Sequence, residues 1–413
     1  MNHIYNLTAK LAELALPLSM PFNSKMRQFV EGRRESFIIL EKKIKKDDKV
    51  IWFHMASLGE FEQGVPILTV VRNIFPNHKI VVSFFSPSGY EQKKNTPLAD
   101  AVVYLPIDTQ SNAEKFIDLL HPNLVIFIKY EFWPNYLKEL NKRKVRTLLV
   151  SGGFREDQLF FKSYGSWMRR SLKSFEHFFV QNSDSEKLLK SIGFNNVTVS
   201  GDTRFDRVAA QLEQNNKLGF VEEFLGGRLC MVAGSTWPED EELLVELINN
   251  DDTPTKFIIA PHQIKPESII SLQKNISKKG ILFSEKKDKE LSGYKVLILD
   301  TIGLLTRVYN YADIAYVGGA AGTTGLHNIL EAATFGIPVV TGKNINKFPE
   351  AIRLRKLAGL YTVNDQKELN EIMFKFINDN SFREKTGMIA GHYISSNTGA
   401  SRVIEQYLRE NFC

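Results

Sequence analysis

The chain has 413 residues, of which 43% are apolar, and this exceeds the size that one hydrophobic core usually supports, so we expect two domains. Its two cysteines, Cys230 and Cys413, form neither a zinc-ligand spacing nor a disulfide framework, a pattern typical of a reducing compartment. The formal net charge is +6, and residues 1–46 alone carry nine Lys and Arg against four Glu, which favours an anionic partner near the N-terminus.

The N-terminal segment contains an apolar stretch with leucines at positions 11, 14, 16 and 18. Polar residues and prolines interrupt it, so it is too short to cross a bilayer, which takes roughly 20 consecutive apolar residues. It also lacks the basic start and the cleavage site of a secretory signal. Four basic residues follow it: Lys25, Arg27, Arg33 and Arg34. We therefore predict that residues 1–46 form a membrane-proximal amphipathic segment beside a basic patch. The alternative is a helix that packs on its own domain.

Residues 50–75 indicate a strand, a turn and a helix. Residues 50–53 form an apolar run, residues 61–75 carry apolar side chains at helical intervals, and Ala56, Ser57 and Gly59 lie between them. Glu60 then falls at a helix N-terminus, where backbone N–H groups and the helix dipole stabilise an ionised carboxylate. From this stretch alone, Glu60 is either functional or an ordinary first-turn residue.

Strand and helix patterns alternate along the rest of the chain, which is typical of parallel sheets covered by helices. The strands expected in the first half are 79–84, 102–105, 124–128, 147–151, 177–180 and 197–200. A polar stretch at 211–227 breaks this alternation, and the strands expected after it are 229–233, 256–260, 281–283, 295–299, 314–317, 338–340 and 360–363. We therefore expect an α/β protein with an N-terminal domain at 47–214 and a C-terminal domain at 215–413.

Four clusters follow strands of the second half, where ligands bind in such folds. They are Ser235 with Thr236, Pro261 with His262, the loop Ile302, Gly303 and Leu304, and a glycine-rich stretch from Gly318 through Gly325 to His327, Asn328 and Glu331. Glycines permit close approach of the backbone to a ligand, and an acidic residue at such a position can accept the ribose hydroxyls. A single loop of this kind is often only a tight turn, but four together predict a nucleotide site.

Five motifs occur in an order and spacing that resemble one family. They are HMASLGE at 54–60, KYEFWP at 129–134, VSGDTRFD at 199–206, AGST at 233–236 and HNILE at 327–331. From about residue 30 onward the chain resembles the Kdo transferases, which transfer 3-deoxy-manno-octulosonic acid (Kdo) from CMP-Kdo to the glucosamine disaccharide of the lipid A precursor, lipid IVA. The resemblance implies a GT-B fold, with two Rossmann-like domains facing across a cleft and a C-terminal helix that returns to the first domain. It also implies an inverting transfer by a peripheral or monotopic enzyme at the cytoplasmic face of the bacterial inner membrane.

The resemblance assigns roles to three residues of the first domain. Glu60 corresponds to the general base, and Glu131 and Arg204 correspond to residues that support the transition state. Arg204 stands where the family commonly has Lys, and the two side chains differ in reach and geometry although both are cationic.

On the donor side, the resemblance assigns the four clusters of the second half to CMP-Kdo. Pro261-His262 stands where the family usually has Pro-Arg, and no Glu follows Gly303, whereas Asn328 and Glu331 match. No Asp-x-Asp motif ends a strand, so we expect a metal-independent enzyme without a cofactor. The expected partners are CMP-Kdo, the lipid A precursor and an anionic membrane, and no nucleic acid.

Two other functions stay open. Another GT-B glycosyltransferase with a UDP-sugar donor would use the same ribose contact, but the SLGE and EFWP motifs would have no assigned task. A non-catalytic bilobal sugar-nucleotide binding protein would share the paired α/β domains, but such proteins are normally exported, and this N-terminus does not resemble an export signal.

Overall fold

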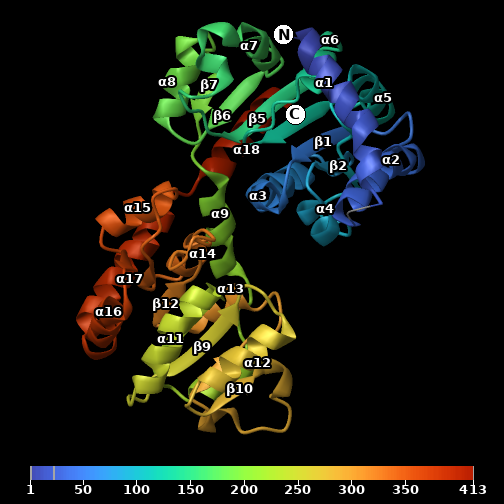
Figure 1. The fold of residues 1–413 in the computed structure, drawn as a ribbon. Helices are drawn as coiled ribbons and strands as arrows, with labels where there is room; N and C mark the ends of the chain where they lie inside the picture. The colour runs from blue at the N-terminus through green and yellow to red at the C-terminus, as the bar shows by residue number, and fades with distance from the viewer. Residues whose placement is uncertain (1, 22–23, 413) are drawn as a thin grey trace. The chain divides into compact units, whose positions relative to one another are not determined.

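The computed structural model describes residues 2–21 and 24–412 and divides the chain into two units (Figure 1). Unit 1 comprises Met1–Arg207 with Thr398–Cys413, and unit 2 comprises Val208–Asn397. The division lies before residue 208, and not after residue 214 as expected. The last 16 residues belong to unit 1, although the expected C-terminal domain ran to residue 413.

Unit 1 is built on a seven-stranded parallel sheet. The strands, in the order β3-β2-β1-β4-β5-β6-β7, are Ala101–Tyr104, Lys79–Phe84, Val50–Met55, Leu124–Ile128, Arg146–Gly152, His177–Val180 and Val197–Val199. Apolar side chains of both sheet faces form two core clusters, one under each layer of helices. Such continuous apolar strands are expected for a parallel sheet that is buried on both faces.

The helices of unit 1 connect its strands and extend to both ends of the chain. They are α1 (Asn2–Ala15), α2 (Ser24–Lys43), α3 (Leu58–Ile74), α4 (Pro87–Lys93), α5 (Gln110–Leu120), α6 (Pro134–Lys142), α7 (Ser166–Leu172), α8 (Ser183–Ser191), α9 (Thr203–Ala209, which continues past the boundary) and α18 (Ala400–Phe412). Short 3₁₀ turns lie at Leu16–Ser19 (η1), Leu159–Phe161 (η2) and Ser163–Gly165 (η3).

Unit 2 repeats the architecture. Its strands, in the order β10-β11-β9-β8-β12-β13-β14, are Gly280–Leu282, Val296–Ile298, Lys256–Pro261, Cys230–Thr236, Ile314–Val317, Val339–Gly342 and Leu360–Val363. Its helices are α10 (Gly219–Leu225), α11 (Pro238–Asn250), α12 (Pro266–Asn275), α13 (Leu305–Val308), α14 (Leu330–Ala333), α15 (Pro349–Lys356), α16 (Gln366–Asn378) and α17 (Asn380–Ser395). Further 3₁₀ turns are Ala210–Glu213 (η4), Phe283–Glu285 (η5), Leu291–Gly293 (η6) and Tyr309–Tyr311 (η7).

The strand order reverses at one place in each sheet. In unit 1 this is between β1 and β4, and in unit 2 it is between β8 and β12. Ligands of doubly wound sheets bind at the carboxyl ends of the strands beside such a reversal. The loops that begin after Met55, Ile128, Thr236 and Val317 are therefore the places where a site is expected.

The C-terminal helix α18 is anchored in unit 1 by a capping carboxylate and by its apolar face. Asp206 accepts hydrogen bonds from the backbone N–H groups of Gly399 (3.0 Å) and Ala400 (3.2 Å) and from the Ser401 hydroxyl (2.9 Å). Ile404 and Leu408 are fully buried in one of the core clusters of unit 1, and Figure 1 shows this red helix among the strands of that unit. The expected α/β class and the return of the C-terminal helix to the first domain are confirmed.

Candidate active site

Glu60 lies in the first turn of α3, directly after β1. Ser57, with an extended backbone, is the N-cap residue of this helix, and its hydroxyl donates a hydrogen bond to Oε2 of Glu60. The carboxylate is half-buried at the strand-order reversal. It therefore lies beside the free backbone N–H groups of a helix start.

Glu131 follows β4 in a loop that leaves the strand through a strained residue. Lys129 has a left-handed backbone (φ 73°), which costs a non-glycine residue on the order of 1–3 kcal/mol. Oε2 of Glu131 accepts a hydrogen bond from Nε1 of Trp133 (2.8 Å) and lies 3.2 Å from Nε2 of His54. The loop thus holds the carboxylate at the end of β4, beside β1.

His54 is the centre of a buried polar chain that the sequence analysis did not identify. Its Nδ1 lies 2.8 Å from the hydroxyl of Ser83, which accepts a hydrogen bond from Nε1 of Trp52 (2.8 Å). Nε2 of His54 also lies 2.9 Å from Nε1 of Trp133, which can only donate, so Nε2 either accepts from Trp133 or, when it carries the proton, donates to Glu131. With either tautomer, His54 lies between Ser83 and the pair formed by Glu131 and Trp133.

Arg204 lies at the start of α9 and pairs with Asp202. Nε of Arg204 is 2.8 Å from Oδ2 of Asp202, which also accepts from Gln181 (3.2 Å). Burial raises the pKa of the nearby Tyr130 hydroxyl, which Arg155 and Arg204 lower and Asp202 and Glu60 raise. Glu60, Glu131 and Arg204 follow β1, β4 and β7, so all three lie at the carboxyl edge of the unit 1 sheet.

The four predicted membrane-contacting residues do not share one environment. The side chain of Lys25 lies outside the described part of the structure, and Arg27 and Arg34 are exposed. Arg33 is only 6% exposed, so it does not form an exposed basic patch with Arg27 and Arg34. Its guanidinium donates to the carbonyl oxygens of Phe29 (2.9 Å) and Phe85 (2.6 Å) and lies 3.3 Å from the centroid of the Phe29 ring.

Helix α1 packs on unit 1 through polar side chains. The Tyr5 hydroxyl donates to Asp108 (2.7 Å), Asn135 donates to Asn6 (2.8 Å), and Asn112 donates to Glu13 (2.5 Å). Five apolar side chains of α1 and η1 point away from the unit and are 56–75% exposed: Ile4, Leu7, Leu11, Leu14 and Leu18. Their spacing of three and four residues places them on one face, which we call the α1 stripe. No helix in the described residues is long and apolar enough to cross a membrane.

In unit 2, the buried carboxylate of Asp240 organises the edge between β8 and β12. It accepts hydrogen bonds from the backbone N–H groups of Trp237 (2.9 Å) and Gly319 (2.7 Å) and from the hydroxyl of Tyr316 (2.9 Å). Gly318 packs so closely that an added Cβ would lie 2.4 Å from the carbonyl oxygen of Ser235. The glycine-rich loop is therefore fastened to the start of α11.

Ser235 and Thr236 were both predicted to contact the sugar donor, but their side chains differ in how accessible they are to a ligand. Ser235 has a left-handed backbone (φ 55°) and is half-buried. Thr236 is only 2% exposed, and its hydroxyl donates to Oε1 of Glu241 (2.9 Å). In this structure the hydroxyl of Thr236 is engaged within the protein, so a donor contact at this position falls to Ser235 or to backbone groups.

His262, His327 and Trp237 form a stacked cluster, of which only the histidines were predicted. The ring centroids of His262 lie 4.8 Å from Trp237 and 4.3 Å from His327. Nε1 of Trp237 donates to Nε2 of His327 (2.9 Å), and because indole can only donate, the proton of His327 must lie on Nδ1. Burial and the neighbouring His262 lower the pKa of His327 to about 4, so both observations indicate a neutral ring.

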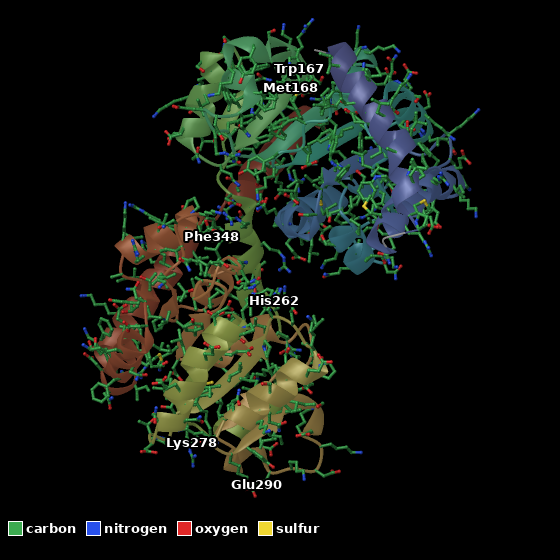
Figure 2. The ribbon with its side chains drawn as sticks, in the orientation of Figure 1. Trp167, Met168, His262, Lys278, Glu290 and Phe348 are labelled. Carbon is green, nitrogen blue, oxygen red and sulfur yellow. The ribbon has the colours of Figure 1, made fainter. Side chains whose placement is uncertain are left out.

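The cluster lies at the end of unit 2 where a ligand is expected. Figure 2 shows His262, which follows β9, at the opposite end of the unit from Lys278 and Glu290, which precede β10 and β11. His262 is exposed, and its backbone N–H donates to the carbonyl oxygen of Thr236 (2.9 Å). His262 is therefore held at the carboxyl edge of the unit 2 sheet, and part of its imidazole ring remains exposed.

The remaining donor residues occupy loops at the same edge. Ile302 is 89% exposed, and Gly303 (φ 92°) and Gly325 (φ 105°) have left-handed backbones. Asn328 lies just before α14, where its Nδ2 donates to Glu331 (3.1 Å) and its Oδ1 accepts from the N–H of Leu330 (3.2 Å). Leu304 precedes α13, and Pro261 ends β9.

Across residues 2–21 and 24–412, no three His, Cys, Asp or Glu side chains gather as metal ligands would.

Comparisons with known proteins agree with the motifs. Residues 31–207 match the family model of 3-deoxy-D-manno-octulosonic-acid transferase (kdotransferase). The 3-deoxy-D-manno-octulosonic acid transferase of Haemophilus influenzae is 26% identical over 388 residues, covering 87% of this chain and 88% of that protein. A bifunctional glycosyltransferase/methyltransferase of Fusobacterium nucleatum is 24% identical over 404 residues, which are 91% of this chain but only 61% of that longer protein.

Solved structures share the fold. UDP-GlcNAc 2-epimerase from Neisseria meningitidis superposes with a TM-score of 0.63 at 16% identity, covering 88% of this chain and 100% of that one. MurG from Acinetobacter baumannii gives a TM-score of 0.54 at 10% identity, covering 88% and 99% of the two chains. These similarities confirm the GT-B fold class and, at such low identity, carry no information about the substrate.

Proposed function

Because this chain belongs to the family of Kdo transferases, glycosyltransferases of lipopolysaccharide biosynthesis, we propose that it transfers Kdo from CMP-Kdo to the glucosamine disaccharide of the lipid A precursor, with inversion and without a metal or cofactor. The observation that carries the proposal is the position of Glu60. It lies at the strand-order reversal of unit 1, in the first turn of a helix, at one edge with Glu131 and Arg204.

In the proposed reaction, an acceptor hydroxyl attacks the anomeric carbon of Kdo. The new C–O bond forms as the bond from that carbon to the CMP phosphate oxygen breaks, and Glu60 takes the hydroxyl proton. A positioned general base contributes typically 10²–10⁴-fold in rate. Glu131, held by His54 and Trp133, and the cationic Arg204 support the charge that develops during transfer.

The proposed donor site is the carboxyl edge of unit 2. Glu331, oriented by Asn328, accepts the ribose hydroxyls of the nucleotide, as acidic residues do in other nucleotide folds. His262 and the backbone N–H groups of the glycine-rich loop meet the phosphate. The acidic ribose contact suits a UDP-sugar equally well, so it does not by itself separate CMP from UDP.

Nucleotide-dependent thermal stabilisation of the purified protein tests this assignment. A ligand that binds only the folded state raises the melting temperature, and the rise grows with the logarithm of its concentration relative to its Kd. We expect CMP to raise it more than UDP at equal concentration. A larger shift with UDP would favour the UDP-sugar glycosyltransferase, and a CMP shift without transfer from CMP-Kdo to lipid IVA would favour the binding protein.

We also propose that the enzyme docks as a peripheral or monotopic protein on the cytoplasmic face of the inner membrane through the α1 stripe. Helix α1 contacts unit 1 with its polar side and leaves its apolar face uncovered, the reverse of an ordinary packed helix. Arg27 and Arg34 are exposed on α2 and supply positive charge for anionic lipids. This arrangement keeps a bilayer-embedded acceptor close to unit 1.

A further inference from the structure

Unit 1 contains a cavity of about 530 Å³ whose lining includes Arg33 and Arg34 but none of the residues proposed to act in catalysis. It lies between α1 with η1, α2 and the loop after β3, and it falls within the size range of about 300–1,000 Å³ that is usual for ligand pockets. Its walls are mainly apolar and include Leu14, Phe29, Phe37, Ile38 and Ile107. We call it the α1–α2 cavity.

The α1–α2 cavity adjoins the α1 stripe. Leu14 belongs to both: it lines the cavity and is 73% exposed. Ile38, on the α2 wall, is 50% exposed. An acyl chain that enters the cavity beside the surface proposed to contact the bilayer would cover these two apolar side chains and remove them from water, which is favourable.

On its inner side the cavity connects with the catalytic edge. Phe29, a wall residue, packs against Phe85 with ring centroids 5.5 Å apart, and Phe85 packs against Trp133 at 4.7 Å. Trp133 donates directly to Glu131 (2.8 Å). The buried Arg33 fastens the first two rings together, because it donates to the carbonyl oxygens of both Phe29 and Phe85.

The charges at the lining suit a lipid with an anionic head group. Arg34 is exposed at the cavity, and Nζ of Lys115 lies 4.6 Å from the ring of Phe37 on its wall. The lining cations Arg33, Arg34 and Lys115 outnumber its two carboxylates, Glu13, which accepts from Asn112 (2.5 Å), and Glu41, which lies 3.9 Å from Lys115. Positive charge beside an apolar cavity complements phosphate groups on a lipid-linked sugar.

We propose that the α1–α2 cavity binds an acyl chain of the acceptor glycolipid and so positions its sugar at Glu60 and Glu131. The acceptor is favoured over bulk phospholipid because the aromatic contacts lead from the cavity to the catalytic carboxylates, which a phospholipid has no reason to approach. This inference rests on the proposed function for the identity of the acceptor. It adds a subsite that selects acylated over deacylated acceptors.

Photocrosslinking tests occupancy without requiring catalysis. Full-length protein on vesicles is irradiated with a lipid IVA analogue that carries a diazirine in one acyl chain, in the absence of CMP-Kdo, and labelled peptides are identified by mass spectrometry. We expect labelling of the peptide that contains Phe37 and Ile38, and at least fivefold less labelling by a phosphatidylglycerol with the same diazirine. Equal labelling by the two lipids, or labelling by neither, would overturn the proposal whether or not CMP-Kdo proves to be the donor.

A matched pair of variants tests the effect on transfer. Ile38→Asp places a carboxylate on the cavity wall, and Leu159→Asp places one at a residue of similar exposure (45%) in η2, outside the cavity. We expect Ile38→Asp to raise the KM for lipid IVA about tenfold or more, since an apolar chain then has to desolvate a charge. The KM for the deacylated disaccharide bisphosphate should not change, nor should either KM change in Leu159→Asp. Equal losses on both acceptors, or no loss at all, would contradict the proposal.

Discussion

Nε2 of His54 lies 3.2 Å from Oε2 of Glu131, although the two residues are 77 positions apart and the histidine side chain is fully buried. His54 belongs to the first of the five sequence motifs and Glu131 to the second, so the pair joins the carboxyl ends of the neighbouring strands β1 and β4. In the proposed mechanism, His54 is a positioning residue, because it contacts Glu131 and does not itself touch the substrate.

His54→Phe tests this role. The ring shape is kept, but Glu131 and Ser83 each lose a partner, so we expect the free energy of unfolding to fall by about 1–3 kcal/mol and kcat to fall with little change in the KM for CMP-Kdo. Urea unfolding and steady-state kinetics measure the two effects. His177→Phe is the control, because that histidine bonds Thr198 (2.9 Å) elsewhere in unit 1. Unchanged kcat in a destabilised His54→Phe would leave only a structural role.

Glu60→Gln tests the general base. The amide keeps the size of the side chain and loses the basic carboxylate, so we expect transfer to fall about 10²–10⁴-fold while CMP still raises the melting temperature. Glu62→Gln, two residues further along α3, is the matched control: Glu62 pairs with Lys93 (2.9 Å) and Arg207 (2.9 Å). Full activity of Glu60→Gln would exclude Glu60 from proton transfer.

The low pKa of His327, about 4 in the folded protein against an ordinary 6.5, predicts a pH dependence of stability. Between these values the unfolded chain binds a proton that the folded protein does not, so the contribution of His327 is complete above pH 6.5 and is lost as the pH falls towards 4. Asp108 has the opposite effect on the pH dependence of stability. Burial raises its pKa to about 6 from an ordinary 3.8, so the folded protein binds a proton that the unfolded chain does not, and this favours the folded state as the pH falls below 6.

Comparison with His327→Gln separates the two contributions. The variant should lose less stability than the parent between pH 6.5 and 4, as measured by urea unfolding at each pH. In the parent, ¹⁵N spectra should show the proton of His327 on Nδ1, and Trp237→Phe should abolish that preference because it removes the indole donor. A parent tautomer with the proton on Nε2 would contradict the assigned hydrogen bond.

The membrane surface is tested with Arg27→Gln/Arg34→Gln. Each exposed cation gains on the order of 1 kcal/mol near an anionic surface, and salt screens this gain. We expect the double variant to bind phosphatidylglycerol vesicles more weakly at low salt, in a flotation assay, with unchanged stability. Arg33→Gln serves as the contrast, because loss of the buried guanidinium should lower stability instead. Equal vesicle binding by the double variant and the parent would place docking elsewhere.

Chelation tests the expected independence from metal ions. We expect transfer in excess EDTA to equal transfer in untreated enzyme, since the proposed charge stabilisation comes from Arg204, His262 and backbone N–H groups. The measurement is the initial rate before and after addition of Mg²⁺. Loss of activity that a divalent ion restores would overturn this expectation.

The sequence by itself determined the two parallel α/β sheets, the strand ends at which the motifs lie and the resemblance to one family. These properties depend on local patterns: apolar runs of strand length, helical periodicity and short motifs at turns are all contiguous in the chain. The positions of Glu60 after β1 and of Glu131 after β4 were predictable for this reason, because each follows its strand directly.

Tertiary structure alone decided which charged and aromatic side chains are buried and which partners they have. Arg33 looked like its neighbour Arg34, yet one packs under Phe85 and the other is exposed. His54 and Trp237 bond partners 77 and 90 residues away. Burial and long-range hydrogen bonds depend on how distant segments of the chain pack together, and no local spacing of residues encodes that packing. The α1–α2 cavity could not be predicted from the sequence for the same reason, because its walls come from three separate segments.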